Sequence, residues 1–212
     1  MQPRDPSARR WQNAQTIAIC TTMCVMPGRV HNILFERAFD QYGFVTADDA
    51  RTLDIDQQRL VEMERRGTLE RVARGLYRFK AIPYGDRDQL MEAALWPRRT
   101  RGVLTHDTAL ELHELCDINP AKIHITVPRR YRINREIPAA YALHHRDLAD
   151  EDRATLEGLP TVTPGRAILD AIEAHIDPKL VEQAIYTVRR RGLVRGKDLS
   201  ALEAQAGRSV GT

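Results

Sequence analysis

The chain of 212 residues has a formal net charge of +3, with 42% hydrophobic and 29% charged residues. These proportions are ordinary for a soluble globular protein, and the length allows one large or two small domains. The net charge is too small to indicate nucleic-acid binding by itself, so the distribution of the basic residues matters more than their sum.

The cysteines and the apolar stretches exclude several classes of protein. Cys20, Cys24 and Cys116 are too few for a disulfide framework, and the first two have no companion Cys or His pair that would indicate zinc. Residues 17–26 are too short an apolar stretch to span a bilayer, and no convincing signal-peptide cleavage site follows them. We predict a reduced, cytoplasmic protein without cofactors or membrane contact, whose residues 1–30 form a flexible leader.

The first regular segments predict two short helices. Residues 32–43 carry apolar side chains at helical spacing and end in a glycine. Residues 45–53 indicate a second helix, with Thr46 as its N-cap and Asp49 as a weak capping-box partner three residues later.

A third helix and a hairpin follow. Residues 54–67 predict a helix that begins at Asp54 or Asp56 and ends at a glycine. Residues 68–72 and 76–80 alternate in the manner of two strands, and the glycine before the second strand suits a tight turn. Three short helices followed by a hairpin is the element order of a winged helix-turn-helix.

The predicted fold class is α+β, with two domains. We expect the winged helix-turn-helix over residues 31–82, a linker containing proline and glycine, a mixed α/β domain over residues 86–205 and a tail over residues 206–212. Within the second domain, the segments around residues 122–128 and 141–148 are expected to pair as strands. Proline suits the first position of a helix, so Pro164 and Pro178 mark two helix starts.

The third helix has the two faces that a recognition helix needs. Leu60 and Met63, on the same face as Gln57 and Glu64, would fix it to the domain. The opposite face carries long polar side chains, and Gln can read adenine and Arg guanine; they are Gln58, Arg59, Glu62, Arg65 and Arg66. In the hairpin, Tyr77 and Phe79 are expected to point inward and the arginines to line the tip and outer face. The predicted DNA-binding residues are Thr46, Gln57, Gln58, Arg59, Arg65, Arg66, Arg71, Arg74 and Arg78.

Residues 56–80 contain seven basic and four acidic residues, an excess equal to the net charge of the whole chain. A local excess of this kind is what phosphate neutralisation needs. A carboxylate such as that of Glu62 is unfavourable near DNA unless it contacts cytosine or pairs with an arginine. Charge-rich helix ends and hairpins are also commonly just solvated faces, and winged helices also serve as protein-interaction modules, so both alternatives stay open.

Four sequence blocks together carry a resemblance to a known family. The stretch LVEMERRGTLERVARGLYRF resembles the end of the winged-helix domain in AbiEi-family antitoxins of type IV toxin–antitoxin systems. LTHDTALELHEL, KIHITVP and VTPGRAILDAI are similar to further blocks of this family, in the same order. Thr105 and Thr108 stand where the family usually has serine, and they keep the hydroxyl. The resemblance extends over residues 31–200.

The resemblance implies an antitoxin that represses its own operon by binding inverted repeats in promoter DNA. It also implies that the C-terminal domain is an antitoxin domain that neutralises a cognate nucleotidyltransferase-like toxin, by direct or by indirect action. The alternative function is a winged-helix transcriptional regulator with a ligand-sensing C-terminal domain. That alternative predicts an apolar pocket among the strands of residues 123–143.

Histidines raise the question of an enzyme or a metal site. His106, His113, His124, His144 and His145 are candidate ligands or acid/base groups, but only the first two have a spacing that favours one helix face. Isolated histidines more commonly cap or pack beside helices, so we predict no catalytic residue and no metal ligand.

A second set of candidates lies further along the chain. Asp170 and Glu173 lack the nearby lysine of a metal-dependent nuclease, and Arg166 is placed to pair with Asp170 along a helix. Basic residues recur in two clusters that could form a partner-docking or second phosphate-binding surface, although arginines at a helix C-terminus also complement the helix dipole. The clusters are Arg129, Arg130, Arg132, Arg189, Arg190 and Arg191.

Overall fold

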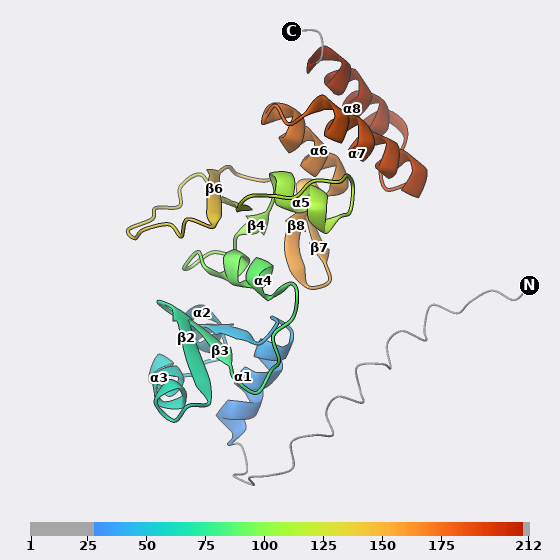
Figure 1. The fold of residues 1–212 in the computed structure, drawn as a ribbon. Helices are drawn as coiled ribbons and strands as arrows, with labels where there is room; N and C mark the ends of the chain where they lie inside the picture. Colours follow the sequence, from blue (N-terminus) through green and yellow to red (C-terminus); the bar gives the residue numbers. More distant parts are fainter. Residues whose placement is uncertain (1–27, 210–212) are drawn as a thin grey trace, which may run out of the picture.

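The structure, a computed structural model, describes residues 28–209. Helices and two β-sheets make up this part of the chain, which confirms the predicted mixed α and β class (Figure 1). Most of the leader predicted for residues 1–30 lies outside the described residues, together with Cys20 and Cys24. Helix α1 already begins at Arg29.

The N-terminal part has the element order and pairing of a winged helix-turn-helix. Its elements are α1 (Arg29–Phe39), β1 (Phe44–Thr46), α2 (Ala47–Thr52), α3 (Gln57–Arg65), β2 (Leu69–Ala73) and β3 (Leu76–Phe79). The three strands are antiparallel in the order β1-β3-β2. The prediction included the helices and the hairpin but not β1, which pairs with β3 along its whole length.

The local signals that start and end these elements behave as predicted. Thr46 and Asp49 form a complete capping box at the start of α2, and Asp56 caps α3 by accepting the N–H of Gln58. Gly75 supplies the positive φ of +77° that the turn between β2 and β3 requires. The hairpin is therefore specified by its own sequence.

The central strand β3 is buried on both faces. Tyr77 and Phe79 point into the core formed with α1, α2 and α3, as predicted, and the Phe79 ring meets that of Phe35 at 5.3 Å between centroids. Arg78 points the opposite way and is only 1% exposed. The prediction that Arg78 lines the outer face of the hairpin is therefore wrong, because another layer of the protein covers that face.

Arg78 is held by several groups from the segment that follows the hairpin. Its guanidinium donates to the Asp88 carboxylate at 3.0 Å and to the Pro83 carbonyl at 2.9 Å, and it lies 3.5 Å from the centre of the Tyr84 ring. Asp88 is itself buried. This pairing compensates a charge that would otherwise be very unfavourable inside the protein.

The C-terminal part contains a five-stranded mixed sheet and the remaining helices. Its elements are α4 (Asp88–Leu95), β4 (Val103–Leu104), α5 (His106–Leu112), β5 (Ile123–Val127), β6 (Tyr141–His145), the 3-10 turn Asp150–Asp152, β7 (Arg153–Leu156), β8 (Leu159–Val162), α6 (Pro164–Glu173), α7 (Pro178–Arg191) and α8 (Gly196–Ser209). The strand order is β6-β5-β4-β8-β7. The expected pairing of β5 with β6 is confirmed, and it is parallel. Pro164 and Pro178 start α6 and α7 as predicted.

A shared hydrophobic cluster joins the two parts. Phe44 and Leu76 of the small sheet pack with Met91 and Leu95 of α4 and with Leu104 of β4. Figure 1 shows α4 lying between the small sheet and the larger one. A second cluster joins α5 to α6, α7 and α8. The domain boundary expected at residues 83–85 stays a prediction, and both sides of it contribute to one core.

The Arg78–Asp88 pair gives a stability prediction. Replacing Asp88 with alanine removes the closer carboxylate of the buried guanidinium and leaves only Glu70 at 3.9 Å, so we expect the free energy of unfolding to fall by about 3–5 kcal/mol. Glu62→Ala, which removes the exposed Arg59–Glu62 pair, should change it by less than about 1 kcal/mol. Urea titration followed by circular dichroism measures both values, and equal effects would contradict the role given to Arg78.

Candidate nucleic-acid interface

Helix α3 combines a buried anchor with an exposed polar surface. Leu60 is fully buried against the N-terminal core, and Met63 packs beside that core. The predicted contact residues of this helix and its C-cap are exposed, namely Gln57, Gln58, Arg59, Arg65 and Arg66. The cap made by Asp56 fixes the N-terminal turn, where the two glutamines stand. The sequence prediction of an outward polar face on α3 agrees with this arrangement.

The arginines of this surface differ in their surroundings. Arg59 forms an ion pair with Glu62 at 2.9 Å, which neutralises the carboxylate that looked unfavourable for a DNA-facing helix. Within residues 28–209, Arg65 and Arg66 pair with no carboxylate. They therefore offer their full charge to an incoming phosphate.

The hairpin adds exposed cations and brings in others from the C-terminal part. Arg71 and Arg74 are exposed on the hairpin. Arg98 lies against Gly75 at the hairpin turn. Burial lowers the pKa of the Arg135 guanidinium, and the positive charges of Arg98 and Arg74 lower it further. Arg74, Arg98 and Arg135 thus form a group that we call the wing-tip cluster.

Arg135 is fixed in this cluster by Trp96. Its guanidinium lies 4.0 Å from the centre of the Trp96 ring and donates to the Trp96 carbonyl. No sequence pattern indicates the wing-tip cluster directly, since its members come from distant segments. Only the stretch PRRTR after α4, with its three arginines, indicates that basic residues gather here.

Thr46 stands at the start of α2, but its polar groups are committed to the cap. Its hydroxyl donates to the Asp49 carboxylate at 2.6 Å and accepts the Asp49 backbone N–H at 2.9 Å. The Thr46 backbone N–H donates to the same carboxylate. A phosphate oxygen needs a donor, and both donors of Thr46 are already used. These hydrogen bonds do not support the predicted phosphate contact of Thr46.

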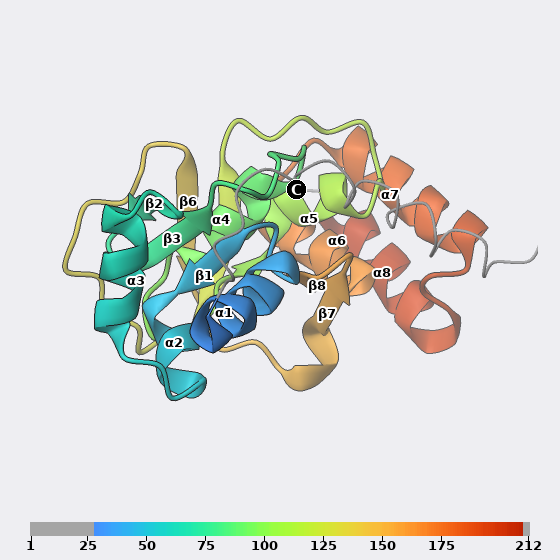
Figure 2. The ribbon, with the colours of Figure 1, turned by 90° about the horizontal axis from the view of Figure 1, so that it is seen from below.

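The two basic clusters of the C-terminal part lie on separate elements. Arg129, Arg130 and Arg132 are exposed in the connection between β5 and β6. Figures 1 and 2 both draw β6 and α7 far apart, so the β5–β6 and α7 clusters do not form one surface.

The arginines of α7 are engaged within the chain. Arg189 pairs with Glu203 of α8. Arg191 donates to the His113 carbonyl at 2.7 Å, and the Arg190 guanidinium lies 5.8 Å from the centre of the Tyr186 ring. The exposed cluster of the β5–β6 connection is therefore the better candidate for a partner surface.

Three histidines that the sequence analysis treated as separate converge in the C-terminal part. His106 at the start of α5, His124 of β5 and His144 of β6 place one ring nitrogen each within 4.8 Å of the others. The His106 and His144 rings are stacked at 3.8 Å between centroids. Burial and the neighbouring histidines lower the pKa of both rings to about 4. These imidazoles are therefore neutral near pH 7.

The other histidines weighed as ligands lie outside this group. His113 forms a hydrogen bond with the Val162 carbonyl at 2.7 Å, and His145 is exposed. No sequence spacing marks the convergence, because it depends on the parallel pairing of β5 with β6. In this register His144 lies opposite Thr126, two residues beyond His124.

The carboxylates considered for a nuclease are occupied by arginines. Asp170 is fully buried and accepts from Arg146 at 2.6 Å and from Arg166 at 2.6 Å. The predicted Arg166–Asp170 pair is confirmed. Glu173 accepts from the same two arginines. This network is compensated in charge and offers no free carboxylate pair for nuclease chemistry.

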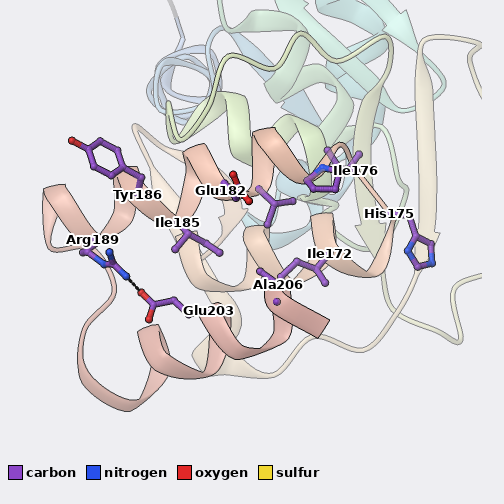
Figure 3. A pocket seen from close by; sticks show the side chains of 12 residues that line it. Ile172, His175, Ile176, Glu182, Ile185, Tyr186, Arg189, Glu203 and Ala206 are labelled. Atoms are coloured by element: carbon purple, nitrogen blue, oxygen red, sulfur yellow. Dashed lines mark hydrogen bonds and ion pairs between the residues drawn. The ribbon is translucent and has the colours of Figure 1, made fainter. Parts of the chain in front are cut away.

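An apolar cavity of about 400 Å³ lies between α6, α7 and α8 (Figure 3). Ile172, Val181, Ile185 and Ala206 line it, and the Arg189–Glu203 pair stands at its edge. The ligand-sensing alternative predicts a pocket among residues 123–143, and this cavity lies outside that segment.

Comparison with known families supports the interpretation of the N-terminal part. Residues 32–80 match the family model described as "Transcriptional regulator, AbiEi antitoxin". The match confirms the resemblance for the segment from α1 to the end of the hairpin, and the similarity of the three later blocks stays a prediction. It supports an antitoxin and transcriptional-regulator role with DNA binding.

Other comparisons are less informative. A comparison with curated proteins finds no significant match. The chain is similar to a crystal structure of the RV2827C protein from Mycobacterium tuberculosis, with 14% identity, 83% of this chain and 81% of that chain covered, and a TM-score of 0.41. A TM-score this low does not establish a shared fold. Among residues 28–209, no helix combines the length and apolar composition needed to cross a bilayer.

The capping box of α2 gives a second stability prediction. Thr46→Ala should lower the free energy of unfolding by about 1 kcal/mol near pH 7, whereas Thr46→Ser keeps the hydroxyl and should cost much less. Denaturant titrations of both variants measure the difference. A serine variant as unstable as the alanine variant would contradict the capping role.

The same variant has an expected pH dependence. Burial raises the pKa of Asp49, but the hydrogen bonds from Thr46, Arg37 and Gln41 outweigh it, so the pKa is lowered from its ordinary 3.8. The stabilisation from this ionised carboxylate is present above that value and is lost as the pH falls through the lowered pKa. The deficit of Thr46→Ala should therefore shrink below about pH 4.

Proposed function

We propose that the chain is a bacterial antitoxin that represses its own operon and counteracts a cognate nucleotidyltransferase-like toxin in the cytoplasm. The observation that carries the proposal is a winged helix-turn-helix whose α3 has an exposed face of glutamines and arginines, within the segment that matches the AbiEi family model. Repression would follow from occupancy of inverted repeats in the promoter.

In the proposed complex, α3 enters the major groove of DNA. Gln57 and Gln58 stand at its N-terminal end, where recognition helices contact base edges, and each amide can pair bidentately with adenine. Arg65 and Arg66 at the other end would contact phosphates. Neutralising phosphates releases counterions, which supplies most of the non-specific affinity.

The hairpin would contact the neighbouring backbone. Arg71 and Arg74 are exposed there, and Arg98 and Arg135 extend the positive surface from the C-terminal part. Arg78 does not belong to this contact set, since its side chain is buried against Asp88. Its role is to hold the hairpin on α4.

The antitoxic activity is assigned to the C-terminal part. Direct contact with a toxin would use the exposed Arg129, Arg130 and Arg132, whose side chains form no hydrogen bond or ion pair within the described part of the chain, while the backbone N–H of Arg129 donates to Asp147 at 3.0 Å. Indirect antitoxic action would need no such surface. The two routes differ in one outcome. Replacing these arginines with uncharged residues should abolish protection of cells from the toxin if contact is direct, and should leave protection intact if the action is indirect.

The second candidate function is a ligand-sensing winged-helix regulator. The apolar cavity between α6, α7 and α8 favours it, since a cavity of this size can enclose a small apolar molecule. We rank it below the antitoxin because the match in the N-terminal part points to an antitoxin family and the cavity lies outside the expected strands.

A DNA-binding prediction tests whether α3 and the hairpin contact DNA. The variant Arg66→Ala/Arg74→Ala should bind a duplex of the operon's own promoter on the order of tenfold or more weakly, and the slope of log affinity against log salt should fall in magnitude by about 2. The control variant Lys179→Ala/Lys197→Ala removes the same charge from exposed positions of α7 and α8. Fluorescence anisotropy at several salt concentrations measures both variants.

Equal binding by the arginine variant and the wild type would exclude this surface as the reader of DNA. Equal losses in the arginine and the lysine variants would indicate a general charge effect instead. These outcomes are distinguishable because both variants lower the net charge by two.

A growth assay tests whether antitoxic activity resides in the C-terminal part, separately from DNA binding by the N-terminal part. Cells that express the neighbouring toxin gene should be rescued by the Arg66→Ala/Arg74→Ala variant as well as by the wild type, because its C-terminal part is unchanged. Failure of a folded variant to rescue would contradict the assignment of antitoxic activity to that part.

In the same assay, loss of rescue by Arg130→Ala/Arg132→Ala with normal DNA binding would favour direct toxin contact, and normal rescue would favour indirect action.

A further inference from the structure

The convergence of three histidines in the C-terminal part is not used by the proposed DNA-binding and antitoxic functions. We propose that His106, His124 and His144 form a binding site for a divalent transition-metal ion, with Zn²⁺ as the best fit. The site lies on α5, β5 and β6, on different elements from the recognition helix.

The backbone holds the three residues in fixed relative positions. His124 and His144 stand on adjacent parallel strands whose register is set by five residue pairs. His106 is tied to the same sheet, since the N–H of Thr105 donates to the His124 carbonyl at 3.1 Å. Ligands on paired strands and at a strand-to-helix junction are placed more accurately than ligands on loops.

The backbone of His106 itself is strained. Its φ is +52°, in the left-handed region that favours glycine. Residues keep such conformations where the surrounding structure enforces them, and they cluster at functional sites. Here the conformation turns the chain from β4 into α5 and directs the imidazole toward the other two rings, since the His106 ring lies 3.8 Å from that of His144 and 5.6 Å from that of His124.

The spacing of the nitrogens is close to that of a tetrahedral metal site. His124 Nδ1 and His144 Nε2 are 3.2 Å apart. Two imidazole nitrogens bound to tetrahedral zinc at about 2.0–2.1 Å are roughly 3.3–3.4 Å from each other. The third nitrogen lies within 4.8 Å of both, so side-chain rotations that move it by about 1–1.5 Å complete the set.

Hydrogen bonds outside the cluster select which nitrogen of His106 faces the others. His106 Nδ1 lies 2.9 Å from the Thr105 hydroxyl, which in turn contacts the Thr126 hydroxyl at 2.9 Å. A ring that donates through Nδ1 leaves Nε2 with a lone pair for a metal. Partners of this kind fix the ring orientation and tautomer of metal-binding histidines.

The charges around the cluster are compatible with an added cation. The nearest arginines, Arg146 and Arg166, are paired with Asp170 and Glu173, so they bring little uncompensated positive charge. Asp107 follows His106, and its Oδ1 is buried without a hydrogen-bond partner in the described part of the chain. Neutral imidazole is the form that binds metals, and imidazole suits zinc, copper and nickel.

Three protein ligands leave one position of a tetrahedral ion for water or an outside ligand. The bound ion would also tie α5 to the edge of the larger sheet, so it would stabilise the folded chain by an amount that rises with the logarithm of the free ion concentration above the dissociation constant. If the three histidines are not a metal site, they form only a hydrogen-bonded polar cluster, and added zinc changes neither its structure nor the stability of the chain. The two descriptions therefore predict different responses to zinc.

The test uses tag-free, full-length protein treated with a chelator and then freed of it. Titration with Zn²⁺ in competition with a chromophoric chelator should show one equivalent bound. His124→Ala and His144→Ala should each weaken binding by at least about tenfold, since loss of a ligand costs no less than loss of an outer partner. His145→Ala is the matched control, because this exposed histidine lies on the same strand outside the cluster.

Two further measurements do not depend on the variants folding. Co²⁺ in place of Zn²⁺ should give the visible absorption band of a four-coordinate ion in the wild type, and Zn²⁺ should raise the melting temperature of the wild type. Circular dichroism and promoter binding check that the variants are folded. Absence of saturable binding in the wild type, or binding that His124→Ala and His144→Ala leave unchanged, would overturn the proposal.

Discussion

The burial of β3 on both faces is the constraint on which the rest of the structure depends. One face of this strand completes the core of the winged helix-turn-helix, and the other carries Arg78 into a buried pair with Asp88 at the start of α4. A buried arginine without its counter-charge is strongly destabilising, so the pair with Asp88 favours this position of α4 against the small sheet. The winged helix-turn-helix and the larger sheet therefore share one buried interface instead of being joined by a linker alone.

Contacts around that pair extend the same arrangement. The Tyr42 hydroxyl donates to the Glu157 carbonyl at 2.7 Å, and Arg87 pairs with the Glu157 carboxylate at 2.5 Å. The first contact links the N-terminal part to the turn between β7 and β8, and the second links the same turn to the start of α4. The apolar cluster of Phe44, Leu76, Met91 and Leu95 excludes water between these polar ties. Helix α3 lies away from this junction, and its polar side chains stay exposed (Figure 1).

Local signals in the sequence were sufficient for much of the fold. Thr46 with Asp49, the glycine of the hairpin turn and the prolines of α6 and α7 act within a few residues, and each of these elements begins or turns where predicted. The exposed face of α3 follows from helical periodicity. In contrast, β1 is three residues long and is defined only by its pairing with β3. The burial of Arg78 and the meeting of His106, His124 and His144 depend on elements distant in sequence, so no spacing along the chain could indicate them.

The wing-tip cluster has a consequence for how the two parts influence each other. Arg74 belongs to the hairpin, while Arg98 and Arg135 belong to the segment beyond α4, yet their positive charges lie close enough to act on one another. A phosphate backbone resting on all three would bridge the junction and relieve their mutual repulsion. A duplex bound in this way would hold the N-terminal and C-terminal parts in one relative position. Suppose that a partner binds to the C-terminal part, shifts Arg98 or Arg135 and thereby changes the affinity for operator DNA by some factor. By thermodynamic reciprocity, DNA binding would then change the affinity for that partner by the same factor.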